Sequence, residues 1–246
     1  MSEIIKTEAV ILSKMNYGDT SNILSVYTKD YGKLSVIIKG ARSPKSKSGF
    51  IADPLNLVQI VIYKKDSRDL QVLSSIDMIS YFPKMKEDID RLKYSFAIIE
   101  LVKKLTPENE TNLRLFNGLS RILSLIDSSN ENPKILFGRF FLFFLKEIGY
   151  ELQLEKCVSC GRTDLTGENL GYNFELGIVC GKCSDKNRMD FKLSQELFNY
   201  MLCLNYNKGA DIYKEFTLDK AIIFMERYLK FHVPDFKGIQ AFQTIK

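Results

Sequence analysis

The sequence predicts an α+β protein in which a five-stranded β-barrel precedes an all-α domain that carries a zinc knuckle of four cysteines. Three observations support this prediction. Apolar and polar residues alternate through the first eighty residues, apolar residues recur at helical spacing after Pro83, and four cysteines stand in two close pairs. We therefore expect a barrel domain over residues 1–80 and a helical domain over residues 81–246, with the knuckle at 157–183.

The strand segments of the expected barrel are short and separated by turn residues. Period-two alternation predicts strands over residues 7–14, 22–28, 33–39, 55–64 and 69–75, with turns at 16–19 and 30–33. The segment 40–53 is too long for a hairpin connection. Five strands with one long, basic loop are typical of an OB-type barrel, whose face and loops commonly bind single-stranded nucleic acid.

Helical periodicity follows the strands. It predicts a helix after Pro83 that ends near residue 105, because Pro107 cannot continue it, and a second helix over residues 111–126. A third helix has Asn132 as N-cap, Pro133 at its first position and Gly149 beyond its end. Ser194 and Thr217 are expected to cap two later helices that reach residues 206 and 232.

The third helix contains a run of phenylalanines at positions 140, 141, 143 and 144. Exposed phenylalanines can stack on bases, but aromatic residues on all sides of one helix indicate burial between neighbouring helices. We therefore expect this run to form core. Cys203 is expected to be a small buried apolar residue, and His232 a packing residue or a charge at a helix C-terminus.

The four paired cysteines predict a structural zinc ion. Cys157 and Cys160 form one pair, Cys180 and Cys183 the other, and nineteen residues separate the pairs. A gap of two residues lets both sulfurs turn toward one metal, and Gly161 allows the backbone amides to fold back onto them. The alternatives are four incidental thiols or a disulfide pair, and the reducing conditions expected for a chain of cytosolic character disfavour the disulfides. Four thiolates leave no position for a catalytic water, so the metal indicates no reaction.

A basic stretch without acids runs from the third strand into the long loop. The net charge of the 246-residue chain is only +5, but Lys33, Lys39, Arg42, Lys45 and Lys47 lie within residues 33–50, which contain no Asp or Glu. A charge run in a loop is commonly solvated surface. The barrel context favours contacts with nucleic acid, with Lys64 and Lys65 as a second cluster. Tyrosines 17, 27, 31 and 63 could add stacking, although alternation buries about half of them.

Several enzyme classes lack their sequence signals. There is no phosphate-binding loop, no HExxH and no GxSxG, and the only histidine lies near the C-terminus. The most apolar run, residues 135–145, is shorter than the roughly 18 to 20 residues of a membrane span. We therefore expect a protein that is not an enzyme and has no membrane partner. A nuclease that uses Asp66, Asp69 and Asp77 with a metal remains an alternative.

The motifs resemble those of the bacterial DNA repair protein RecO family. The resemblance rests on YGDTS at 17–21, TKDYGKLS at 28–35 and KGARSPKS at 39–46. It continues in LVKKLTPE at 101–108, IGYELQL at 148–154, CVSCG at 157–161 and GIVCGKC at 177–183. These motifs occur in order and cover about the first 200 residues.

The resemblance implies a cytoplasmic recombination mediator that associates with the nucleoid during repair. Such a protein would bind single- and double-stranded DNA, anneal complementary strands, and work with RecR to load RecA onto DNA coated by single-strand binding protein. The resemblance also implies DNA contacts at Lys39, Arg42, Lys45 and Lys47. The acidic tail of single-strand binding protein would need an apolar groove with cations on the helical domain, for which Arg121 and Arg139 are candidates.

The alternative binding function is an RNA-binding module that combines the OB barrel with the zinc knuckle. Competition between single-stranded DNA and RNA would separate the two, because an RNA-binding protein is expected to use the 2′-hydroxyl.

Overall fold

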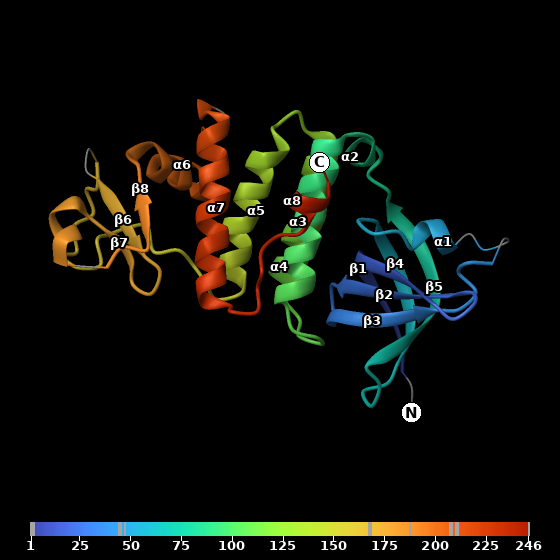
Figure 1. The fold of residues 1–246 in the computed structure, drawn as a ribbon. Coiled ribbons are helices and arrows are strands. Elements are labelled where there is room, and N and C mark those ends of the chain that lie inside the picture. The colour runs from blue at the N-terminus through green and yellow to red at the C-terminus, as the bar shows by residue number, and fades with distance from the viewer. Residues whose placement is uncertain are drawn as a thin grey trace. The chain divides into compact units, whose positions relative to one another are not determined.

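The computed structural model describes residues 3–43, 46, 48–166, 169–186, 188–206, 209 and 212–245. The chain divides into two compact units: residues 1–130 together with 239–246, and residues 131–238. No helix within the described part of the chain is long and apolar enough to cross a membrane. Figure 1 labels the elements of both units.

The first unit contains the barrel. Its strands are β1 (Glu3–Tyr17), β2 (Ser21–Thr28), β3 (Gly32–Ile38), β4 (Leu57–Lys64) and β5 (Leu70–Ser80). They close in the order β1-β2-β3-β5-β4, because β1 pairs with both β2 and β4. The β3–β5 pair is parallel and the other pairs are antiparallel. This topology confirms the predicted OB-type barrel.

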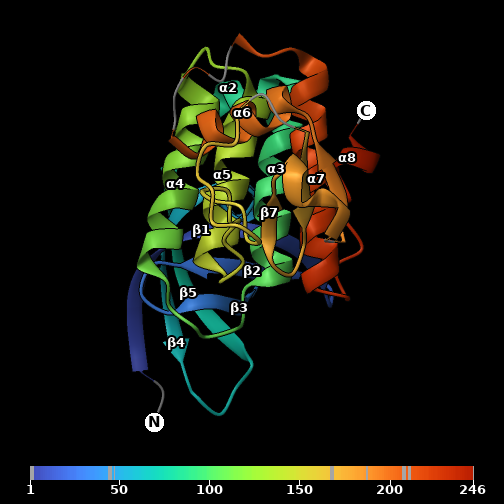
Figure 2. The same cartoon turned by 90° about the vertical axis from the view of Figure 1, so that its left-hand side faces the viewer.

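The barrel interior is filled by the inward side chains that alternation places there. Leu24, Val26, Val36, Val58 and Ile60 are fully buried. Both β1 and β5 extend well beyond the predicted segments, β1 with a register shift between Ile11 and Ser13. The hairpin between β4 and β5 extends away from the barrel in both views (Figures 1 and 2).

Three helices follow the barrel in the first unit: α2 (Pro83–Glu87), α3 (Ile89–Leu105) and α4 (Leu113–Ser128). The helix expected after Pro83 is interrupted at Asp88, which is extended and whose side chain accepts a hydrogen bond from the Arg91 amide. Its end at Leu105 was predicted. A short helix, α1 (Ser48–Ile51), lies in the long loop.

The chain between α3 and α4 returns to the barrel. Asn109 donates its amide to the Lys33 carbonyl at 2.9 Å, and Lys33 and Glu108 form a parallel bridge. Gly32 is required at this contact, because it has φ +65° and a Cβ there would lie 2.0 Å from the Glu110 carbonyl oxygen.

The C-terminal segment belongs to the first unit, where it packs on α3. The Glu100 carboxylate accepts hydrogen bonds from the amides of Gln240 and Ala241 at 2.8 and 2.9 Å. The Phe242 ring meets Tyr94 edge-on, with 5.6 Å between centroids. We call residues 239–246, which include the helix α8 (Ala241–Thr244), the C-terminal strap.

The second unit combines three helices with a small sheet. The helices are α5 (Pro133–Glu147), α6 (Gln195–Tyr206) and α7 (Glu215–His232), and the strands are β6 (Leu170–Asn173), β7 (Gly177–Val179) and β8 (Phe191–Leu193) in the order β7-β6-β8. The sheet was not expected, because strands of three or four residues are too short to show periodicity.

The capping predictions for the second unit have different outcomes. Asn132 caps α5 by accepting from the Lys134 amide, and Ser194 accepts from the Leu197 amide at 3.2 Å. The Thr217 prediction is wrong, because α7 begins at Glu215 and the Thr217 hydroxyl donates to Glu196 on α6 at 2.7 Å. Thr217 therefore joins two helices.

The phenylalanine run of α5 is mostly core, as predicted. Phe140, Phe141 and Phe144 are buried, and Phe143 is half-buried. Cys203 is half-buried, and its sulfur lies 3.7 Å from the Tyr213 hydroxyl. The His232 ring pairs with the Phe174 carbonyl at 2.8 Å.

Candidate metal centre and nucleic-acid interface

The four paired cysteines converge on one point in the second unit. Cys157 and Cys160 lie in the turn that precedes β6, and Cys180 and Cys183 follow β7. All four sulfurs lie within 4.8 Å of one another, and those of Cys160 and Cys180 are 3.7 Å apart. A tetrahedral zinc with bonds of about 2.3 Å separates its sulfurs by roughly 3.8 Å. The four sulfurs therefore fit a single tetrahedral ion and are too far apart for disulfides.

Local backbone hydrogen bonds shape this cluster. The Gly161 amide donates to the Cys157 carbonyl at 2.9 Å, and the Cys183 amide donates to the Cys180 carbonyl at 3.0 Å, so each pair closes a turn. Gly161 has φ +72°, the left-handed conformation that the sequence predicted for it. The Cys180 amide donates a hydrogen bond to the Cys157 sulfur, with 3.4 Å between nitrogen and sulfur. Such amides stabilise thiolates and orient them toward a metal.

The two buried cysteines have opposite pKa shifts. Burial raises the pKa of Cys180 to about 12, and the neighbouring thiols add to this shift. Burial also opposes ionisation of Cys157, but the amides of Cys180, Cys160 and Ser159 outweigh it and lower the pKa of Cys157 to about 6. Metal ions bind thiolates, so loading the cluster is expected to release the proton of the Cys180 thiol.

Two predicted DNA contacts are exposed at one end of the barrel. Lys39 follows the last residue of β3, and Arg42 lies in the next turn. The Arg42 Nη2 donates to the carbonyls of Gly18 and Asp19, the latter at 2.7 Å. These bonds use one nitrogen of a guanidinium that carries five N–H donors. Lys45 and Lys47 lie outside the described residues.

Lys33 is engaged inside the first unit. Only 10% of its side chain is exposed, and its ammonium donates to the carbonyls of Lys103 at 2.8 Å and Thr106 at 2.5 Å. It also lies 3.5 Å from the Glu108 carboxylate. A cation at the C-terminal end of α3 satisfies free carbonyls and complements the helix dipole. Because these contacts occupy its ammonium, Lys33 is not among the proposed DNA contacts.

Replacement of Lys33 by methionine is expected to lower the free energy of unfolding by about 2 kcal/mol, because the buried Thr106 carbonyl and the half-buried Lys103 carbonyl lose a charged donor. Urea denaturation measures this change. The matched control is Lys39→Met, which alters an exposed lysine at the other end of the same strand and is expected to leave stability within about 0.5 kcal/mol. Equal stability of both variants would contradict the capping role.

Lys64 and Lys65 lie away from Lys39 and Arg42. In the strand register, Lys64 lies opposite Glu3, the first residue of β1. Ile38, the residue before Lys39, lies opposite Asn22 on β2, and Asn22 lies opposite Asn16 near the other end of β1. The two clusters are therefore at opposite ends of β1. The Lys64 ammonium is bonded to Asp66, and Lys65 is exposed.

The outer face of the barrel carries an apolar row that the sequence did not reveal. Each residue of the row lies opposite the next one on the neighbouring strand, so the row runs around the barrel. It includes the exposed residues Ile4, Met15 and Tyr63. Its members, in order, are Met15, Ile23, Ile37, Val72, Tyr63 and Ile4. Of the other tyrosines, Tyr17 is 52% exposed, Tyr31 is half-buried and Tyr27 is buried, so fewer of the four are buried than the expected half.

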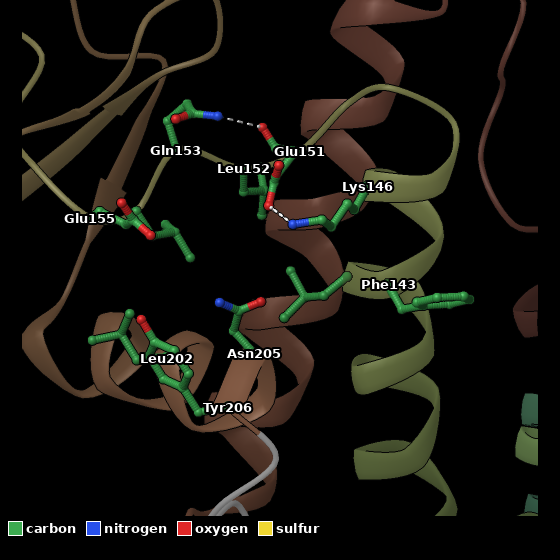
Figure 3. A pocket seen from close by; sticks show the side chains of 11 residues that line it. Phe143, Lys146, Glu151, Leu152, Gln153, Glu155, Leu202, Asn205 and Tyr206 are labelled. Carbon is green, nitrogen blue, oxygen red and sulfur yellow. Dashed lines mark hydrogen bonds and ion pairs between the residues drawn. The ribbon is translucent and has the colours of Figure 1, made fainter. Parts of the chain in front are cut away.

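A cavity of about 230 Å³ lies in the second unit between α5, α6 and the segment 151–155. Figure 3 shows Lys146 and Glu151 meeting at its edge, where their ion pair measures 2.5 Å, while the Phe143 ring points away. The candidate cations for an acidic peptide are not among its lining residues. Arg139 pairs with Glu131 at 2.5 Å, and Arg121 lies exposed on α4 of the other unit.

The carboxylates of the nuclease alternative are exposed and form no metal site in the described part of the chain. Asp66 is bonded to Lys64, whose hydrogen bond lowers the pKa of the carboxyl. Asp69 lies in the β4–β5 hairpin and Asp77 faces outward from β5. Among the described residues, the four cysteines are the one group with metal-ligand spacing.

Comparison with known families covers both parts of the chain. Residues 1–82 match the family model for the N terminal of recombination protein O, and residues 86–237 match the model for its C terminal. The chain belongs to the recombination protein O family. This membership confirms the resemblance seen in the sequence and supports a role in DNA repair and recombination.

Curated relatives agree with the family models. The chain is 33% identical to the DNA repair protein RecO of Alkaliphilus metalliredigens, over 81% of each chain. It is 37% identical to the protein of that name from Pelodictyon phaeoclathratiforme, over 64% of this chain and 60% of the relative. The match to the Acetivibrio thermocellus relative is 25% identical and spans 92% of this chain and 90% of the relative.

Proposed function

We propose that the protein is a recombination mediator that binds single- and double-stranded DNA and anneals complementary strands. The observation that carries this proposal is the pair of exposed cations, Lys39 and Arg42, at one end of a closed OB-type barrel. Lys45 and Lys47, within five residues beyond Arg42, and Lys65 at the other end of the barrel complete the proposed contact set.

Annealing in this proposal needs no catalytic residue. Cations that hold two strands without reading their sequence lower the repulsion between phosphates, and base pairing then supplies the free energy. The Arg42 bonds to Gly18 and Asp19 hold this cation on the β1–β2 turn. A fixed cation loses less conformational entropy on binding a phosphate than a mobile one.

We also propose that the protein acts with RecR and single-strand binding protein to load RecA. Family membership supports these partners, since recombination protein O is the matched family. A pull-down with purified RecR, and a second with single-strand binding protein that has or lacks its acidic tail, would test the two interactions separately. Retention of neither partner would contradict this part of the proposal.

The metal in this proposal is a structural zinc ion. Four thiolates in tetrahedral array favour zinc or an iron–sulfur centre. When bound, the ion supplies a covalent link between the turn that carries Cys157 and Cys160 and the end of β7. The cysteine side chains would orient it, and the amide of Cys180 would stabilise a thiolate at Cys157.

The triple variant Lys39→Ala, Arg42→Ala, Lys45→Ala is expected to bind DNA less tightly. Its affinity for DNA should also depend less steeply on salt concentration. Each phosphate contact contributes about 0.7 to the slope of log affinity against log salt for single strands, so the slope should flatten by about 2. Fluorescence anisotropy at several salt concentrations measures it. The effect should be similar for oligonucleotides of different sequence, because phosphate contacts do not specify bases.

A control triple with the same change in charge replaces the exposed lysines 6, 103 and 230 by alanine. Its salt slope is expected to stay close to that of the parent protein. An unchanged slope for the first triple, or equal flattening in both triples, would contradict the proposed interface. Stronger competition by RNA than by single-stranded DNA would instead indicate an RNA-binding protein.

A further inference from the structure

Two aromatic rings meet on the surface of the first unit, outside the proposed phosphate contacts. Phe50 on α1 is 56% exposed, and Tyr81, directly after β5, is 38% exposed. Their centroids are 5.0 Å apart with planes tilted by 39°, and the Lys86 ammonium lies 4.1 Å from the centre of the Tyr81 ring. Figure 1 shows α1 beside the end of β5 that leads into α2. We call this group the aromatic platform.

A buried asparagine holds the platform together. Asn56 is fully buried, and its amide group donates to the carbonyls of Phe50 at 3.2 Å and Ile51 at 3.1 Å. Its side-chain oxygen accepts a hydrogen bond from Lys86. One side chain therefore fixes both the helix that carries Phe50 and the lysine that covers Tyr81. Asn56 thus links the backbone of α1 to the lysine that lies over Tyr81.

Backbone strain is concentrated at the same place. Among the described residues, Leu55, Phe82 and Asn109 are the non-glycine residues with positive φ. Leu55, with φ 74°, precedes Asn56, and Phe82, with φ 53°, follows Tyr81. Large side chains rarely adopt this conformation, and it persists where the surroundings impose it, commonly at binding sites. One strained residue thus adjoins Asn56 and the other adjoins Tyr81.

The platform adjoins the turn that carries a proposed phosphate contact. A Cβ on Gly49 would lie 2.8 Å from the Ala41 carbonyl oxygen, so α1 contacts the residue before Arg42. Lys14 donates to the Gly49 carbonyl at 3.2 Å and pairs with Asp53. The helix that carries Phe50 thus contacts the residue before Arg42, and Lys86 lies over the Tyr81 ring.

We propose that the aromatic platform stacks an unpaired base of single-stranded nucleic acid while Arg42 holds a neighbouring phosphate. This inference rests on the proposed DNA-binding function and adds to it a site for the base. Bases of every type have a π-face, so stacking binds single strands without sequence preference. A duplex covers its base faces, so the platform would distinguish single strands from duplexes.

The test measures binding of Phe50→Ala and Tyr81→Leu to three probes: a mixed-sequence single strand, the same strand with abasic sites, and a duplex. We expect about tenfold weaker binding to the normal single strand. Binding to the abasic strand and the duplex, and the salt slope, should stay unchanged. The matched control is Phe216→Ala, which removes a 66% exposed phenylalanine that also carries a lysine, Lys220, over its ring.

A conservative probe follows stacking directly. The chain contains twelve tyrosines but no tryptophan, so Phe50→Trp introduces a single tryptophan at the platform, whose fluorescence can be excited separately from that of the tyrosines. Single-stranded DNA is expected to quench it, whereas an abasic strand should not, and Phe216→Trp should respond to neither. Absence of quenching at saturating DNA, or equal losses on all three probes for Phe50→Ala, would overturn the proposal.

The outcomes separate this inference from the function on which it rests. If the parent protein binds DNA with a salt slope that the Lys39, Arg42 and Lys45 triple flattens, while the platform variants bind normally, only the platform assignment fails. If the parent protein binds no DNA, the proposed function fails first.

Discussion

Replacement of Cys180 by serine is expected to abolish zinc retention and to unfold the small sheet of the second unit. Cys180 is fully buried, and its sulfur lies among the other three within 4.8 Å. Structural zinc sites contribute on the order of 10 kcal/mol in small modules. The loss should stay local here, because α5, α6 and α7 have their own buried faces. Elemental analysis and amide hydrogen exchange of β6–β8 measure the two effects.

The matched control is Cys203→Ser, which alters the one cysteine outside the cluster. This variant is expected to retain about one zinc ion per chain and normal exchange in β6–β8. Full zinc in the Cys180 variant would contradict the ligand assignment, and iron in the parent protein would contradict the choice of metal. Loss of annealing with an intact fold after metal removal would show that the ion is more than structural.

Truncation of Phe141 to alanine is expected to lower the free energy of unfolding by about 3–5 kcal/mol. The side chain is fully buried, with its ring 5.6 Å from that of Phe137, and its removal leaves a cavity that the core cannot refill. Urea denaturation measures the loss. Phe143→Ala, on the same helix but half-buried, should cost clearly less.

DNA binding by the Phe141 variant should keep the parent salt slope at temperatures where the variant is folded. A variant with unaltered stability that lost DNA binding would place the nucleic-acid site on the second unit. The barrel would then not be the interface.

The barrel could be predicted because its signals are local. Alternating side chains and turn residues within a few positions determine β2, β3 and β4, and the predicted ends agree to within two residues. The ends of β1 and β5 were missed because exposed apolar residues there, such as Met15 and Ile79, blur the alternation. The cysteine cluster was predicted from spacing alone, since two short loops bring their own ligands together.

The remaining site features depend on contacts that sequence spacing does not encode. Lys33 has the same chemistry as Lys39, and only the return of residues 106–110 to β3 distinguishes a buried cap from an exposed cation. Phe50 and Tyr81 lie thirty-one residues apart and carry no shared motif. A buried asparagine and two strained residues join them, and these appear only in three dimensions.

The C-terminal strap imposes a delay on the assembly of the first unit. Glu100 on α3 bonds to Gln240, which is 140 residues later in the chain. At a synthesis rate of about 5–20 residues per second, a ribosome needs roughly 7–28 s to make the intervening chain. During this time the barrel and its helices exist without their last packing partner, while the entire second unit emerges and can bind its metal. The first unit to begin folding is thus the last to be completed.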